Sequence, residues 1–378
     1  MAPHPHLGYA NPVVDHDFPD PGIFYDRQAG TWYAFSTNAN GKNIQCSYST
    51  DFCCWTHHDK DCLPESLPPW TSGAPGFLWA PEVVPAPQGR GGFLMYLTAQ
   101  DTRFRKQCIG AAYSQHSPLG PYRWVSNGPI ISRGATGGCI DPQPFDDPVS
   151  GRRFLVFKSD LDKMYTLQPQ LWLQVLSEDG LTLEDDMVPL LAPTMDYQCK
   201  LLEAPYLTYH QPSGTYVLFY SSGTFSNKSY ATSYAISRNG ICGPYQPASG
   251  PLLCTDEARK IYGPGGACIV EGVEGHTFIV FHALQHEGGP RKMCIHRLEW
   301  TPDGIPYLPG RPNCGKRLRL CAEQEDDQEH FRHHQHHQPN PVPVPEAATH
   351  GVSGGGHGDH DKYKNLAKKL GGALKKLG

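Results

Sequence analysis

The sequence predicts an all-β protein: a five-bladed β-propeller followed by a disordered C-terminal tail. Three observations favour this fold. Short apolar runs recur at a nearly constant interval, glycine (40) and proline (36) are abundant among the 378 residues, and no helical pattern separates the runs. Many short strands joined by Gly/Pro-rich turns are typical of all-β folds, whereas a parallel α/β fold needs helical segments between its strands.

Five apolar runs mark the expected blades. They begin at residues 32, 93, 154, 216 and 278, so the steps are 61, 61, 62 and 62 residues. Each run follows a turn-like stretch and has the residue types and length of a β-strand. Further strand-like segments and turns follow each run. A repeat of this size has room for the four strands of a propeller blade, and four to eight blades close a ring.

The repeats place the propeller domain at residues 1–321, after which the composition changes. Residues 322–358 are acidic, then His-rich, Pro-rich and Gly-rich in turn, which indicates a low-complexity linker. Residues 359–378 form a basic amphipathic segment with leucines on one helical face and lysines beside it. Such a segment binds a membrane surface or a protein partner, or it remains a solvated tail; the sequence leaves both alternatives open.

Charge and cysteine usage limit the other functions. The net charge of -5 gives no basic face for nucleic acid. No apolar run is long enough for a transmembrane helix, and the N-terminus lacks the pattern of a signal peptide. A cytoplasmic protein and a secreted one without its leader both remain open, and the sequon at Asn227 is compatible with secretion. Most of the thirteen cysteines stand singly in apolar runs, which predicts buried free thiols, with disulfides as the alternative.

Four of the five repeats carry a carboxylic acid 11–13 residues ahead of the apolar run. These acids are Asp20, Glu82, Asp141 and Glu203, and the fifth repeat has Gly266 at this place. The first strand of a blade lines the central channel, so we expect the acids to converge. Buried carboxylates close to one another acquire different pKa values. Glycoside hydrolysis needs such a pair, with one carboxyl protonated and one ionised.

The motifs around these acids resemble glycoside hydrolase family 43, whose five-bladed propellers act mainly on arabinose- and xylose-containing polysaccharides. The resemblance covers roughly residues 10–310 and includes arabinofuranosidase, β-xylosidase and arabinanase types. The matching motifs are Asp17-Phe18-Pro19-Asp20-Pro21-Gly22-Ile23, Trp79-Ala80-Pro81-Glu82-Val83, Gly138-Cys139-Ile140-Asp141-Pro142, Leu202-Glu203-Ala204-Pro205, and Phe281-His282-Ala283 with Arg291.

The resemblance implies a role for each of three acids. Asp20 is the general base that activates a water, and Glu203 is the general acid that protonates the glycosidic oxygen. Asp141 orients Glu203 and favours its protonated form, because a nearby like charge disfavours ionisation. The resemblance also implies inversion, for which the acid and base carboxyls stand about 6.5–9.5 Å apart.

Four further residues are candidates for substrate binding: Trp79, Glu82, His282 and Arg291. Three of them have a structural alternative. Trp79 is either a sugar-stacking platform or a core residue, and Arg291 is either a site residue or part of a surface ion pair. For Glu82 we favour a structural role, in which it ties neighbouring inner strands together by bonding an arginine or backbone N–H groups.

The resemblance bears on cofactors as well. Many members of the family hold a central calcium ion with the help of a histidine in the inner strand of the fifth blade. Gly266 stands at that position here, which argues against the calcium site. We expect the reaction to require no metal and no other cofactor.

The sequence thus predicts a glycosidase acting on plant cell-wall polysaccharides or oligosaccharides, in the first place an α-L-arabinofuranosidase or a β-xylosidase. The choice between arabinose and xylose stays open, because loops and pocket depth set it. One alternative is a propeller that binds carbohydrate without cleaving it. Another is a fructan-active hydrolase, which would retain configuration and bring its carboxyls to about 5–5.5 Å.

Overall fold

The computed structural model of the protein describes residues 9–64, 67–71, 77–87, 89–125, 127–134, 137–159, 169–311 and 314. The statements below concern these residues. All of them belong to one compact unit, Met1–Lys316. The predicted linker at 322–358 and the basic segment at 359–378 lie outside the described residues.

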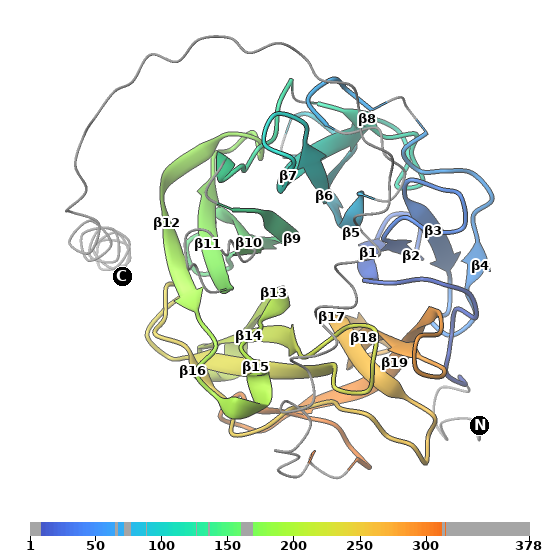
Figure 1. Cartoon of the computed structure of the whole chain (residues 1–378), viewed down its shortest axis with the longest axis vertical. Coiled ribbons are helices and arrows are strands. Elements are labelled where there is room, and N and C mark those ends of the chain that lie inside the picture. Colours follow the sequence, from blue (N-terminus) through green and yellow to red (C-terminus); the bar gives the residue numbers. More distant parts are fainter. Residues whose placement is uncertain are drawn as a thin grey trace, which may run out of the picture. The chain divides into compact units, whose positions relative to one another are not determined.

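Five antiparallel sheets form a ring, and each has four strands in sequence order (Figure 1). The all-β propeller predicted from the repeats is therefore confirmed. The strands are β1 (Gly22–Asp26), β2 (Thr31–Ser36), β3 (Gln45–Ser49) and β4 (Thr56–His57); β5 (Trp79–Pro85), β6 (Phe93–Asp101), β7 (Lys106–Ser114) and β8 (Arg123–Trp124); β9 (Cys139–Asp146), β10 (Arg153–Ser159), β11 (Gln170–Leu176) and β12 (Leu183–Leu191); β13 (Glu203–His210), β14 (Thr215–Ser222), β15 (Ala231–Ser237) and β16 (Gln246–Pro247); and β17 (Tyr262–Val273), β18 (His276–Leu284), β19 (Arg291–Trp300) and β20 (Pro306–Tyr307). Two short 3₁₀ turns, η2 (Asp196–Gln198) and η3 (Gln211–Ser213), flank β13.

The five apolar runs form the second strand of each blade, where both faces of the sheet are covered. All eight residues of β14 are buried, for example. One core cluster joins Phe35 of β2 to Leu97 of β6, and another joins Val217 of β14 to Ile279 of β18. A strand buried on both faces reads as a continuous apolar run rather than an alternating one. This is why the repeat is visible in the sequence.

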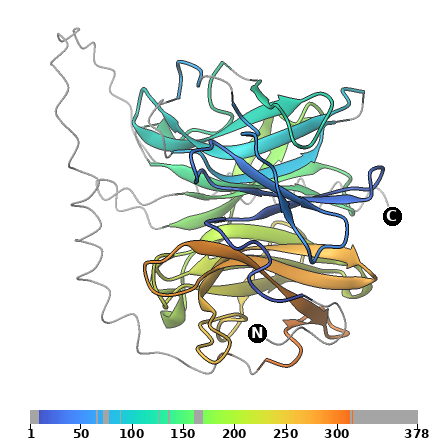
Figure 2. The same cartoon turned by 90° about the vertical axis from the view of Figure 1, so that its right-hand side faces the viewer.

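The N-terminal segment closes the ring by running along the fifth blade. The N–H of Val13 donates to the carbonyl of Met293 at 2.9 Å, and the N–H of Phe18 donates to that of Arg291 at 2.7 Å. The side chain of Asn11 bonds both backbone groups of Ile295. Figure 2 shows this dark blue segment descending onto the orange blade. This segment pairs with β19 and reaches Asp20 two residues after Phe18. The contacts that close the ring therefore also set the position of that acid.

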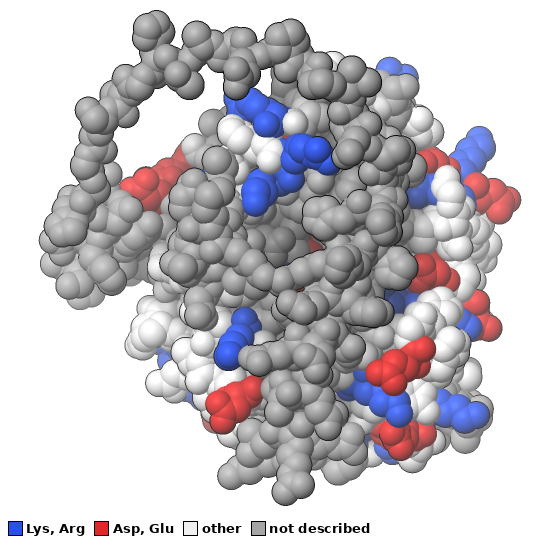
Figure 3. Space-filling model, in the orientation of Figure 1, with Lys and Arg blue, Asp and Glu red and all other residues white. Residues whose placement is uncertain are grey.

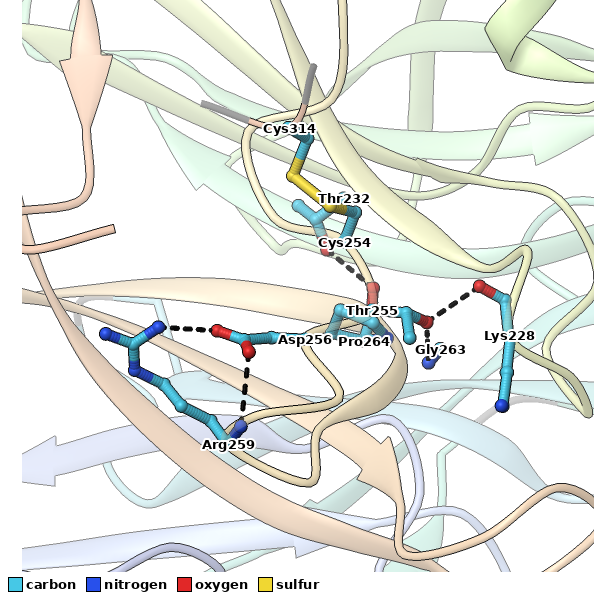
Figure 4. The surroundings of a disulfide bond; sticks show 9 residues. All are labelled: Lys228, Thr232, Cys254, Thr255, Asp256, Arg259, Gly263, Pro264 and Cys314. Carbon is cyan, nitrogen blue, oxygen red and sulfur yellow. Dashed lines mark hydrogen bonds and ion pairs between the residues drawn. A yellow bond between two sulfur atoms is a disulfide. The ribbon is translucent and has the colours of Figure 1, made fainter. Parts of the chain in front are cut away.

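Most of the cysteines described are free, as the sequence predicts. Six are buried thiols: Cys46, Cys62, Cys108, Cys139, Cys268 and Cys294. Cys254 and Cys314, in contrast, form a disulfide beside the loop that leads into β17 (Figure 4). The disulfide joins residues 60 positions apart, so it ties the segment after the fifth blade to the connection between the fourth and fifth blades.

Charged side chains of both signs are interspersed along the right-hand edge of the molecule in Figure 3. This mixture agrees with the small net charge of -5. Among the described residues, no helix is long and apolar enough to cross a membrane.

Candidate active site

Every blade has a residue in the left-handed backbone region at an equivalent place near the start of its inner strand. The five residues and their φ angles are Asp20 (51°), Ala80 (45°), Asp141 (58°), Ala204 (47°) and Gly266 (56°). Strand pairing shifts at this point in β5, β9, β13 and β17, as in a β-bulge. Bulges next to active sites redirect side chains. A left-handed conformation costs a non-glycine residue about 1–2 kcal/mol, so the surrounding contacts must hold it.

A ring of hydrogen bonds provides these contacts. The backbone N–H of each left-handed residue donates to a side chain of the preceding blade. The pairs are Asp20 to His282 Nδ1 (3.1 Å), Ala80 to Thr37 Oγ1 (2.9 Å), Asp141 to Thr98 Oγ1 (3.0 Å), Ala204 to Asp141 Oδ2 (2.8 Å) and Gly266 to Ser221 Oγ (2.9 Å). The inner strands are thus locked to one another at the level of the acids.

The four acids found in the sequence do not occupy equivalent positions in their blades. Asp20 and Asp141 are themselves the left-handed residues, whereas Glu203 stands one residue before Ala204 and Glu82 stands two residues after Ala80. Asp20, Glu82 and Asp141 all line one cavity between the inner strands. Glu203 lies next to this group, since its charge acts on Asp141.

Asp20 is held as a carboxylate by the side chains around it. Thr37 Oγ1 donates to Asp20 Oδ2 at 2.7 Å, and Arg291 Nη1 lies 3.3 and 3.4 Å from the two carboxylate oxygens. Burial alone would raise the pKa of Asp20. Arg291 is the largest influence that opposes this effect, and together with His282 and Thr37 it holds the pKa of Asp20 below its usual range. Asp20 is therefore ionised and can accept a proton.

His282 supports Asp20 from the fifth blade. Its side chain is fully buried, and burial lowers its pKa, so the imidazole is neutral. Because Nδ1 accepts the N–H of Asp20, the proton of the neutral ring lies on Nε2. The ring stacks on Tyr230, with ring centroids 5.7 Å apart and an interplanar angle of 8°. Of the described residues, none is a hydrogen-bond partner of Nε2.

Asp141 and Glu203 form a coupled carboxyl pair with a buried lysine beside it. Lys158 Nζ lies 3.0 Å from Glu203 Oε2, and Asp141 Oδ2 accepts the N–H of Ala204. Burial and then the charge of Glu203 raise the pKa of Asp141. The site therefore contains an ionised carboxylate, Asp20, and a carboxyl pair in which one member readily holds a proton.

Glu82 differs from the role expected for it. Burial raises the pKa of Glu82 to about 8, and within the described part of the chain its carboxyl has no hydrogen bond or ion pair. It faces the cavity and packs against the first strand, since a Cβ at Gly22 would lie 3.1 Å from Glu82 Cδ. The expected bond from Glu82 to an arginine or backbone N–H is thus not observed.

The remaining candidate residues, Trp79 and Arg291, lie at strand ends. Trp79 begins β5 and is half-buried, with its ring centroid 6.0 Å from that of Phe77. Arg291 begins β19 and binds Asp20, so it belongs to the site and not to a surface ion pair.

Two site residues were missed in the sequence. Lys158 has a signal there: it stands four residues after the start of its apolar run, the same repeat position as His282. Lys158 thus lies within β10, a buried strand in which a charged side chain is unusual. Tyr230 has no such signal, because it lies in the loop before β15. Burial, followed by Glu203, Asp20 and Asp141, raises the pKa of its phenol.

The residues present do not fit a calcium ion held by a histidine at position 266. A Cβ at Gly266 would lie 2.7 Å from His282 Nδ1 and 2.9 Å from Asp20 Oδ1, so the space is filled. His282 Nδ1 already accepts the N–H of Asp20. In the parts of the chain that the structure describes, no three His, Cys, Asp or Glu residues are placed to hold a metal.

Comparison with known proteins agrees with this geometry. The family model of glycosyl hydrolases family 43 matches residues 9–306. The structure resembles a thermostable family-43 glycoside hydrolase (25% identity, 81% of this chain and 97% of that chain covered, TM-score 0.69). It also resembles an endo-1,4-β-xylanase from Bacteroides thetaiotaomicron (24%, 79% and 97%, 0.64) and an α-L-arabinofuranosidase from Lactobacillus brevis (18%, 80% and 97%, 0.65). No curated protein matches the chain. The match over residues 9–306 shows that the chain belongs to glycoside hydrolase family 43 and is a glycosidase.

Proposed function

We propose that the protein hydrolyses glycosidic bonds of arabinose- or xylose-containing polysaccharides with inversion of configuration. The observation that carries the mechanism is the contrast between two carboxyl environments in one ring. Asp20 is bound by Arg291 and Thr37, which favour its ionised form. Asp141 and Glu203 are coupled, and coupling favours retention of a proton by the pair.

In this mechanism Asp20 removes a proton from a water that attacks the anomeric carbon. Glu203 protonates the glycosidic oxygen on the opposite side as the bond breaks. Because two neighbouring carboxylates repel each other, the presence of Asp141 favours retention of one proton by the pair. Asp141 also accepts the N–H of Ala204, which fixes the residue that follows Glu203. Lys158 orients the Glu203 carboxyl through the ion pair at Oε2.

For the substrate, we propose a plant cell-wall polysaccharide or its oligosaccharides, with α-L-arabinofuranosidase or β-xylosidase activity. The support is the family together with similar structures that are described as an α-L-arabinofuranosidase and as a xylan β-1,4-xylosidase. A screen of aryl α-L-arabinofuranosides, aryl β-D-xylosides, arabinan and arabinoxylan, with the products sized, separates these activities.

We further propose that hydrolysis needs no bound metal, because the space at Gly266 is filled by Asp20 and His282. The rate should be unchanged after exhaustive treatment with a chelator and after addition of calcium. A loss of activity with the chelator that calcium restores would contradict this proposal.

The decisive experiment removes the two proton-transfer groups one at a time. Glu203→Gln and Asp20→Asn should each lower kcat on aryl pentosides by at least about 100-fold, the usual contribution of a positioned acid or base. Glu299→Gln, near the end of β19 and far along the strand from Arg291, is the matched control and should keep full activity. Full activity of either site variant would overturn the assignment.

The stereochemistry of the first product tests the mechanism further. NMR of the anomer formed immediately after cleavage should show inversion. Retention would instead favour fructan-type chemistry. Binding of oligosaccharides without cleavage of any tested substrate would favour a propeller that binds carbohydrate only.

A further inference from the structure

The loop at 223–230, between β14 and β15, carries two aromatic residues with opposite environments. Tyr230, at its end, is only 2% exposed and lies against Gly265, where a Cβ would be 2.0 Å from the Tyr230 ring. Phe225 is 39% exposed, although it is a large apolar side chain. An exposed aromatic side chain fixed beside a catalytic centre is a candidate for ligand contact.

Phe225 is placed beside the ionised acid by Arg291. The guanidinium carbon of Arg291 lies 4.9 Å from the centre of the Phe225 ring, which is the geometry of a cation–π contact. The same guanidinium binds both carboxylate oxygens of Asp20. A single side chain therefore connects the exposed ring to the proposed base.

The loop is held in place by several local contacts. Asn227 Oδ1 accepts bonds from the N–H and the hydroxyl of Ser229, and the N–H of Gly288 donates to the carbonyl of Ser226. Thr255 Oγ1 donates to the carbonyl of Lys228 at 2.7 Å (Figure 4).

The same hydroxyl of Thr255 accepts the N–H of Gly263, which belongs to the same strand, β17, as Gly266. Thr255 also follows Cys254, which the disulfide to Cys314 anchors. Phe225 is thus exposed on a loop that hydrogen bonds hold in one conformation. Because the loop is already ordered, a ligand that contacts the ring costs little conformational entropy.

We propose that Phe225 is a sugar-stacking residue that binds the glycone, the sugar unit attacked on the side of Asp20; the inference rests on the glycosidase function proposed above. The carbon-bound hydrogens on one face of a pentose ring are apolar, and an aromatic face covers them well. Phe225 lies on the Asp20 side of the site, so the ring it meets is the one the activated water attacks. Its contact is apolar, so it contributes binding in the ground state and the transition state alike.

The test compares Phe225→Ala with Phe225→Tyr and with Tyr307→Ala. Tyr307 is also 39% exposed but lies on β20 at the outside of the fifth blade, so it controls for the loss of an exposed aromatic ring. Phe225→Ala should raise KM about tenfold on aryl pentosides and on oligosaccharides alike, with kcat nearly unchanged. The inhibition constant of the free pentose should rise by a similar factor. Phe225→Tyr should restore both, and Tyr307→Ala should resemble the wild type.

A second measurement separates sugar contact from an indirect effect through Arg291. If Phe225 only positioned Arg291, the acidic limb of the pH profile of kcat/KM would move in Phe225→Ala; we expect it to stay in place. Unchanged KM and inhibition constants, a loss confined to oligosaccharides, or a shifted acidic limb would each overturn the inference. In that case wild-type hydrolysis of pentosides would still support the proposed function, whereas its absence would refute that function first.

Discussion

Lys158 Nζ lies 3.0 Å from Glu203 Oε2, and the two side chains are only 4% and 14% exposed. A general acid has to carry a proton, whereas a neighbouring cation favours the ionised form of a carboxyl. Asp141 acts in the opposite sense, through its own negative charge. Both side chains belong to the third blade, Asp141 to β9 and Lys158 to β10, whereas Glu203 lies on β13 of the fourth blade. The third blade therefore places an anion and a cation beside the proposed acid of the next blade.

Removal of the lysine charge should extend activity to higher pH. In Lys158→Met, the basic limb of the pH profile of kcat/KM should move upward by about one unit, the lower end of the effect of one close charge. Lys158→Arg should leave the limb near its wild-type position, and so should Lys228→Met, which removes an exposed lysine paired with Glu257. A limb that does not move in a folded Lys158→Met variant would show that the lysine has no influence on the acid.

Replacement of Arg291, which binds the proposed base Asp20, should narrow the pH profile of kcat/KM from its acidic side. Arg291 is the largest influence that lowers the pKa of Asp20, and burial opposes it. In Arg291→Gln the pKa of Asp20 rises, so the carboxylate is protonated at higher pH. The acidic limb of kcat/KM should move upward by about one unit or more. Arg291→Lys retains the charge and should move it less; an acidic limb shared by wild type and Arg291→Gln would contradict the role of this ion pair.

The buried carboxyl of Glu82 should make the stability of the folded protein depend on pH. Burial raises its pKa from 4.5 to about 8 in the folded state, so between these values the folded protein binds a proton that the unfolded chain has lost. The free energy of unfolding must then fall as the pH rises through this range. Glu82→Gln removes the effect and should stabilise the protein at pH 8 by at least about 1.4 kcal/mol, the equivalent of one pKa unit. At pH 4 the difference should be small, and equal differences at both pH values would rule out the burial effect.

Gly266 should tolerate no side chain. In Gly266→Ala, a Cβ would lie 2.7 Å from His282 and 2.9 Å from Asp20, in a left-handed conformation. We expect a melting temperature lowered by several degrees and a loss of activity beyond tenfold, because the base is displaced. Gly30→Ala is the matched control: its φ of 62° is similar, but nothing lies within 4 Å of the new Cβ. It should show only the backbone cost of about 1–2 kcal/mol, with full activity. Equal losses in the two variants would mean that the contact with Asp20 and His282 is unimportant.

The sequence by itself determined the number of blades, because second strands buried on both faces must be apolar throughout and so repeat visibly at 61 or 62 residues. It also indicated that acids of four blades meet near one axis, since they stand 11–13 residues ahead of those strands. Tertiary structure decided what each acid can do. Asp20 and Asp141 share the same left-handed backbone position, yet one faces Arg291 and the other faces Glu203, so the pKa of the first is lowered and that of the second is raised. These partners come from other blades, from β19 and β13, and the spacing of a repeat carries no information about which side chains of neighbouring blades will meet.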